Sequence, residues 1–167
     1  MNITWLRTFV FFIVLLFAQV LILNHIHLFG CAMPLLYVYF VISFRRDCPR
    51  WAVLLLSFAL GLSVDIFSNT PGVASTAMTF IGFVQPYLLS LFVTRESPDD
   101  LQPSFSSIGV AKYLLYTFIL VFLYCLLFFT LEVFSFFDLP RWAESVGGST
   151  VLTLLFIWVI ENLTKNR

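Results

Sequence analysis

Charge is scarce in this 167-residue chain. Only 11% of its residues are Asp, Glu, Lys or Arg, whereas soluble domains carry about 25%. Hydrophobic residues make up 60% of the chain, and the nine basic and nine acidic residues cancel. This composition predicts an integral membrane protein, and we expect no nucleic-acid partner.

Motifs for chemistry are also missing. The chain has no Gly-rich phosphate loop, no nucleophile elbow and no zinc-binding helix motif. Its three cysteines, Cys31, Cys48 and Cys125, are too scattered for metal ligands, and we expect them to be small apolar fillers. His25 and His27 could hold a metal only if other ligands converged on them. We therefore expect a protein that is not an enzyme, with no catalytic residue, metal or cofactor.

The apolar residues form blocks separated by short polar breaks, and several blocks reach the roughly 20 residues that a membrane-spanning helix needs. The second block is the weakest, because it contains Gly30 and Pro34 and is short enough to be re-entrant or buried. We predict one transmembrane domain over 1–167. Its six predicted spans are 5–23, 28–44, 51–67, 73–94, 110–134 and 143–160.

The basic residues favour a crossing by the second block, because short loops rich in Lys and Arg stay in the cytoplasm. Without that crossing, the basic loop 45–50 would lie outside. With six spans and both termini in the cytoplasm, Arg141 is the single basic residue outside. The inner ones are Arg7, Arg45, Arg46, Arg50, Arg95, Lys112, Lys165 and Arg167. We therefore predict a six-span all-helical bundle with cytoplasmic termini.

A small-residue seam runs along the third block. By helical spacing, Ser57, Gly61 and Asp65 share one face. Small residues let two helices approach closely, which matters in lipid because no hydrophobic force drives helices together there. Pro71 and Gly72 then force a tight connection and suit a helix start. We predict an intimate hairpin of the third and fourth spans.

Asp65 is a charge at the end of an apolar run, so it needs an explanation. In a structural interpretation its carboxylate accepts hydrogen bonds from Asn69, Thr70, Ser75 or the free N–H groups that open the fourth helix. In a functional interpretation it carries a proton, binds an ion or anchors an external partner. Gly61, Asp65, Asn69, Pro71 and Gly72 are the main candidates for a structural or partner-docking site.

Three further residues are weaker candidates. Glu132 is an acid near the outer end of the fifth block, and a pair with Arg141 is its simplest explanation. Gln85 and Pro86 place a polar group and a helix breaker inside the fourth block. Broken helices can line transport sites, although a packing kink explains the same pair.

Three runs of the chain resemble those of the rod shape-determining protein MreD family: Pro34-Leu35-Leu36-Tyr37-Val38-Tyr39, Phe58-Ala59-Leu60-Gly61-Leu62-Ser63-Val64-Asp65 and Thr70-Pro71-Gly72. The resemblance covers the first half of the chain, and length and span number agree with it. Gln85 departs from the family pattern, in which an Arg is expected before the Pro, so no role for a charge carries over to that position.

The resemblance implies a non-enzymatic subunit of the bacterial cell-elongation machinery in the inner membrane. Its expected partners are MreC and, through it, MreB, RodA and the elongation-specific penicillin-binding transpeptidase. The family also looks similar to the substrate-binding membrane subunits of vitamin-uptake transporters. A small-molecule-binding subunit is therefore the alternative function, and Asp65, Asn69, Gln85 and Glu132 are the polar groups it could use.

Overall fold

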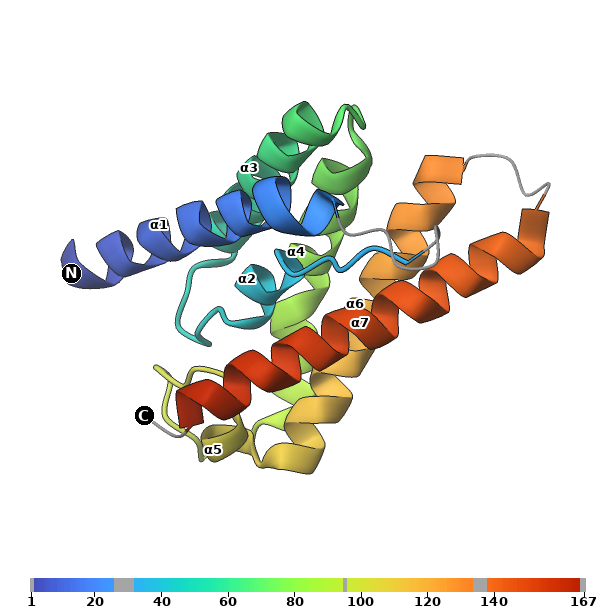
Figure 1. The fold of residues 1–167 in the computed structure, drawn as a ribbon. Coiled ribbons are helices and arrows are strands. Elements are labelled where there is room, and N and C mark those ends of the chain that lie inside the picture. The colour runs from blue at the N-terminus through green and yellow to red at the C-terminus, as the bar shows by residue number, and fades with distance from the viewer. Residues whose placement is uncertain (1, 26–31, 95, 134–137, 166–167) are drawn as a thin grey trace.

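The computed structural model describes residues 2–25, 32–94, 96–133 and 138–165 of the chain. Helices form the regular structure of this part (Figure 1). Five of them are long and apolar enough to cross a membrane, so the chain is an all-helical, multi-pass membrane protein, as predicted.

Five of the six predicted spans correspond to long helices whose bounds differ from the prediction by a few residues. The first continues beyond its α-helical part through a π-helical turn and a 3-10 turn. The elements in chain order are α1 (Asn2–Phe17), η1 (Ala18–Ile22), η2 (Leu23–His25), α2 (Val38–Ile42), α3 (Arg50–Ser68), α4 (Val73–Phe92), α5 (Phe105–Ile108), α6 (Val110–Val133) and α7 (Leu139–Lys165).

The helix predicted over 28–44 is wrong in the part that the structure describes, residues 32–44. Here a non-helical stretch leads into α2, which has only five residues. Pro34 explains the difference, because proline has no N–H to donate and disfavours a helical residue before it. All residues of this stretch except Met33 and Ser43 are buried. We call 32–44 the buried segment.

The buried segment runs parallel to α7. Its backbone N–H groups at Met33 and Leu35 donate to the hydroxyls of Ser149 and Thr153, each at 3.1 Å. Further along, the Tyr39 hydroxyl donates to Glu161 at 2.9 Å. Residues 149 to 161 of a helix span about 18 Å, more than half of the roughly 30 Å of hydrocarbon in a bilayer. The segment therefore passes through the bundle, and the count of six crossings stays a prediction.

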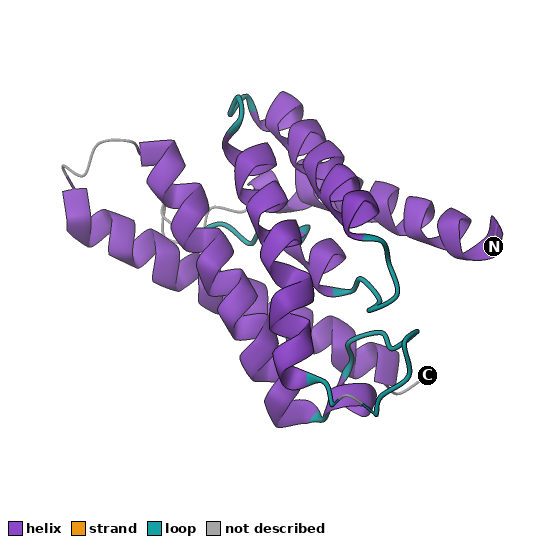
Figure 2. Cartoon of the chain, turned by 180° about the vertical axis from the view of Figure 1, so that it is seen from behind, coloured by secondary structure: helices purple, strands orange, loops and turns teal. Residues whose placement is uncertain are grey.

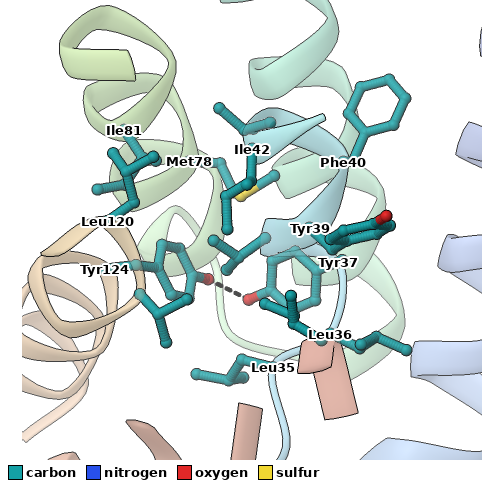
Figure 3. Packing of buried hydrophobic residues seen from close by; sticks show 14 of the residues in the cluster. Leu35, Leu36, Tyr37, Tyr39, Phe40, Ile42, Met78, Ile81, Leu120 and Tyr124 are labelled. Atoms are coloured by element: carbon teal, nitrogen blue, oxygen red, sulfur yellow. Dashed lines mark hydrogen bonds between the residues drawn. The ribbon is translucent and has the colours of Figure 1, made fainter. Parts of the chain in front are cut away.

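Helices surround the segment: α2 contacts α1, α3, α4 and α6, and the stretch before α2 appears in Figure 2 as a teal loop among the helices. The Gln19 amide, in the π-helical turn, bonds to it twice: its nitrogen donates to the Pro34 carbonyl and its oxygen accepts from the Leu36 N–H, both at 3.0 Å. Tyr37 is fully buried and shares a hydrogen bond with Tyr124 of α6 (Figure 3). These contacts join the segment to the core.

The long helices pack as antiparallel neighbours around this centre. α3 lies along α4, and α6 contacts both α4 and α7. Both termini, α5 and the turn after α2 lie at one end of the bundle (Figure 1), which we call the termini end. The connection between α3 and α4 lies at the opposite end.

Thr153→Val tests the support of the buried segment. The change removes the hydroxyl that accepts from Leu35 and donates to the Ser149 carbonyl at 2.7 Å. We expect a loss of about 1–3 kcal/mol in the free energy of unfolding in detergent, because a buried N–H loses its acceptor. Thr164→Val is the matched control, since its exposed hydroxyl bonds only to the carbonyl of Ile160 in its own helix. Equal stability of the two variants would contradict the assigned contact.

Candidate functional site

The corner between α3 and α4 gathers the main residues predicted as a site. α3 ends at Asn69, whose positive φ of 56° is the left-handed conformation of many helix ends. The N–H groups of Asn69 and Thr70 both donate to the Asp65 carbonyl. Two residues later Gly72, with φ of 85°, opens α4. Pro71 and Gly72 thus form the predicted tight turn.

Asp65 binds the start of α4 with both carboxylate oxygens. One oxygen accepts from the Thr70 hydroxyl at 3.0 Å and from the N–H of Ala74 at 2.8 Å, and the other accepts from the N–H of Ser75 at 2.9 Å. The first N–H groups of a helix lack partners within the helix and favour negative charge. The carboxylate is 4% exposed. The hydrogen bonds are those of the structural interpretation.

Gly61 allows α3 and α4 to touch backbone to backbone. A Cβ at this position would lie 2.6 Å from the Cα of Ser75 and 2.7 Å from the Ala74 carbonyl oxygen. Further along the hairpin, away from the corner, a Cβ on Gly82 would lie 2.7 Å from the Ser57 hydroxyl. The predicted seam is therefore real on both helices, and it places Asp65 within reach of α4.

The outward surface of the corner comes from other residues. Asn69, Pro71 and Gly72 are exposed, and Ile66 and Phe67 of α3 expose 71% and 61% of their side chains. Because both oxygens of Asp65 are engaged inside, a partner at this corner would meet the turn and these apolar side chains. The docking role of the corner remains a prediction.

Gln85 supports the far end of the buried segment. Its amide nitrogen donates to the Tyr116 hydroxyl at 3.0 Å and to the Phe44 carbonyl at 3.4 Å, and the Tyr116 hydroxyl reaches the Ile42 carbonyl at 3.5 Å. The last carbonyls of a helix need such partners. Pro86, half-buried within α4, is the next residue. Gln85 therefore satisfies the end of α2.

Glu132 is exposed near the end of α6, and Arg141 is exposed near the start of α7. The pairing of these two residues stays a prediction. The hydrogen bonds of Asp65 and Gln85 within the described residues do not include Glu132.

Sequence reasoning missed several buried polar residues, among them Ser149 and Thr153, which accept hydrogen bonds from the buried segment, and also Gln19 and Glu161. Gln19 is fully buried, although it was a visible polar residue in the first apolar block. Glu161 is 5% exposed and lies one residue past the predicted end of the sixth span. Its carboxylate accepts from the Tyr39 hydroxyl at 2.9 Å and from the Phe105 N–H at 3.3 Å, so it joins the buried segment to the start of α5.

The cysteines and histidines that the structure describes belong to no cluster of metal ligands. Among the described residues no three His, Cys, Asp or Glu side chains are placed to hold a metal ion. Cys125 is buried in the core, as a filler should be, and Cys48 is a half-buried free thiol. Burial raises the pKa of the Cys48 thiol, which lowers its reactivity. His25 is exposed, whereas His27 and Cys31 lie outside the described residues.

Comparisons of the chain with protein-family models, with curated proteins and with solved structures found no match.

Gly61→Ala tests the close contact between α3 and α4. We expect a loss of about 1–3 kcal/mol in the free energy of unfolding, because the added methyl group meets backbone atoms of α4 that cannot move independently. Gly147→Ala is the control, since a Cβ there has no atom within 4 Å. That change should be neutral or stabilise α7 by up to about 1 kcal/mol. Equal effects on unfolding in detergent would refute the tight seam.

Asp65→Asn and Asp65→Leu test whether Asp65 acts as a hydrogen-bond acceptor, because only Asn keeps an acceptor oxygen. Leucine leaves the N–H groups of Ala74 and Ser75 and the Thr70 hydroxyl without their acceptor, at about 1–3 kcal/mol for each buried donor. Asparagine keeps one acceptor oxygen, so its loss should be clearly smaller. The two variants are compared by their abundance in the membrane and by the midpoint of thermal unfolding in detergent. If the leucine variant matched the original chain, the hydrogen-bonded role would be wrong.

Proposed function

We propose that this chain is a non-enzymatic scaffold or regulatory subunit of the bacterial cell-elongation machinery, similar to the MreD family, in the inner membrane. It would link lateral peptidoglycan synthesis to cell shape. The choice of family is supported by the resemblance of Pro34 to Tyr39, the Gly61 to Asp65 stretch and the Pro71-Gly72 turn. The arrangement of polar and apolar groups supports a scaffold over other functions.

The observation that carries the proposal is that polar side chains inside the bundle bind the chain's own backbone. Gln19 and Thr153 hold the buried segment, Gln85 holds its end, and Asp65 holds the start of α4. A small-molecule site needs a few polar groups converging on a cavity. Of the residues predicted for such a site, none lines the four cavities described for the structure. This favours a structural use of the polar groups.

The apolar surface of α1 suits a partner helix. Only 11% of its span is buried, compared with 28–44% for the other four spans. Large side chains that stay exposed on it include Trp5, Leu6, Phe9, Val10 and Val14. We propose that a membrane helix of MreC packs on this surface and that the complex reaches MreB, RodA and the elongation-specific penicillin-binding transpeptidase through it.

The positions of the basic residues indicate how the protein is oriented in the membrane. Arg7 lies near the start of α1, Arg45, Arg46 and Arg50 border the turn before α3, and Lys165 ends α7, all at the termini end. Arg141 lies near the start of α7, at the other end. By the preference of basic loops for the cytoplasm, the termini end faces the cytoplasm in this proposal. The corner of α3 and α4 would then face the wall.

Purification of a tagged chain from a rod-shaped bacterium in mild detergent tests the proposal. We expect MreC, RodA and the transpeptidase to co-purify. Replacing Leu6 and Phe9 of α1 with Ala should lower MreC recovery at least tenfold, because these exposed side chains form the proposed contact. Replacing the exposed Leu91 and Leu155 of α4 and α7 with Ala is the matched control and should leave recovery unchanged.

One result would contradict the scaffold function, and another would contradict only the proposed role of α1. One is the recovery of a bound vitamin-like molecule with no wall-synthesis protein, which would favour the transporter subunit. The other is equal MreC recovery from both double variants, which would remove the proposed role of α1 while leaving the complex itself intact.

A further inference from the structure

A half-open cavity of about 360 Å³ lies at the termini end, between α1 and α7. The buried segment and the turn that follows it form the inner wall, and the linker between α4 and α5 contributes at the edge. The lining includes Arg7, Phe11, Phe40, Arg45, Gln102 and Ile160. The volume falls within the roughly 300–1,000 Å³ of small-molecule sites.

Among the described residues, the charged side chains that line the cavity are both basic. Arg7 and Arg45 are its two charged residues. Within the described part of the chain, neither guanidinium takes part in a hydrogen bond or ion pair. The nearest acids belong to adjacent cavities: Asp47 lines a smaller one that shares Arg45, and Glu161 lines another, where it already accepts from Tyr39 and Phe105. Two unpaired guanidinium groups on one cavity suit an anion.

The remaining wall is apolar and aromatic. Phe11 of α1 packs on Tyr39 and Phe40 of the buried segment, with ring centroids 5.7 and 6.0 Å apart, and Phe40 packs on Phe44 at 4.9 Å. Arg7 precedes Phe11 by one helical turn and so lies on the same face of α1. Arg45 directly follows Phe44. Each arginine therefore lies next to an aromatic residue and closer to the termini end.

We propose that this cavity binds the phosphate headgroup of an anionic phospholipid, with Arg7 and Arg45 on the phosphate and the start of one acyl chain against Phe11 and Phe40. Basic pockets between membrane helices on the cytoplasmic side are the usual sites for such headgroups. A phosphate ion would use the two arginines alone, whereas a lipid also covers the aromatic wall. The cavity opens between α1 and α7 because α1 is the least packed span.

Native mass spectrometry of the purified full chain tests this binding. Dioleoylphosphatidylglycerol should bind at least tenfold more tightly than dioleoylphosphatidylcholine, which has the same chains. Replacing Arg7 and Arg45 together with Gln should abolish that preference and weaken phosphatidylglycerol binding at least tenfold. Arg46→Gln is the matched control: it is an exposed neighbour of Arg45, donates to the Ser97 carbonyl and does not line the cavity, so binding should stay within twofold.

Two further arms separate the possible outcomes. A variant with Lys at positions 7 and 45 keeps the positive charge and should keep the preference for phosphatidylglycerol. It shows whether replacing the two arginines by itself disrupts the fold, which would also abolish lipid binding. Inorganic phosphate at millimolar concentration should not displace the lipid. Displacement by phosphate, equal binding of the two lipids, unchanged binding in the Gln variant, or a co-purified protein helix covering the cavity without lipid would each overturn the proposal.

Discussion

No water reaches the hydrocarbon core of a bilayer, so every backbone N–H and C=O there must find a partner in the protein. The rest of this structure depends on how that constraint is met in the buried segment. Pro34 prevents a regular helix, and the groups that it leaves free are bonded by side chains from elsewhere in the chain. Gln19, Ser149 and Thr153 serve the non-helical part, and Gln85 and Tyr116 serve the end of α2.

These partners fix the packing of the helices that carry them. Each side chain must reach one particular backbone atom, so α1, α4, α6 and α7 cannot shift along the segment without breaking a bond. The hairpin of α3 and α4 is held differently, by the close contact at Gly61 and by the carboxylate of Asp65 on the first N–H groups of α4. Hydrogen bonds to the buried segment thus order the central helices, whereas the hairpin combines a close contact at Gly61 with the hydrogen bonds of Asp65.

The sequence was sufficient for features whose cause is local. Hydropathy located five long helices, and the spacing of Ser57, Gly61 and Asp65 identified a seam that α4 does fill. The Asp65 hydrogen bonds were predictable because their donors lie within ten residues. Hydropathy could not reveal the buried segment, because it depends on how apolar the residues are and carries no information on the path of the backbone. The partners of Glu161 are 56 and 122 residues away, and nothing in one sequence pairs positions so distant.

The two ends of the bundle differ in a way that bears on function. At the corner of α3 and α4 both carboxylate oxygens of the buried Asp65 already accept hydrogen bonds, so the turn and its apolar neighbours are what a partner could contact. At the termini end two arginines line a cavity without a protein partner in the described chain, beside the least packed span. The acyl chain of a lipid bound in that cavity would contact Phe11 and Phe40, the pair of rings through which α1 packs on the buried segment. Because α1 is also the proposed surface for a partner helix, lipid binding and partner binding would be coupled through the same few aromatic contacts.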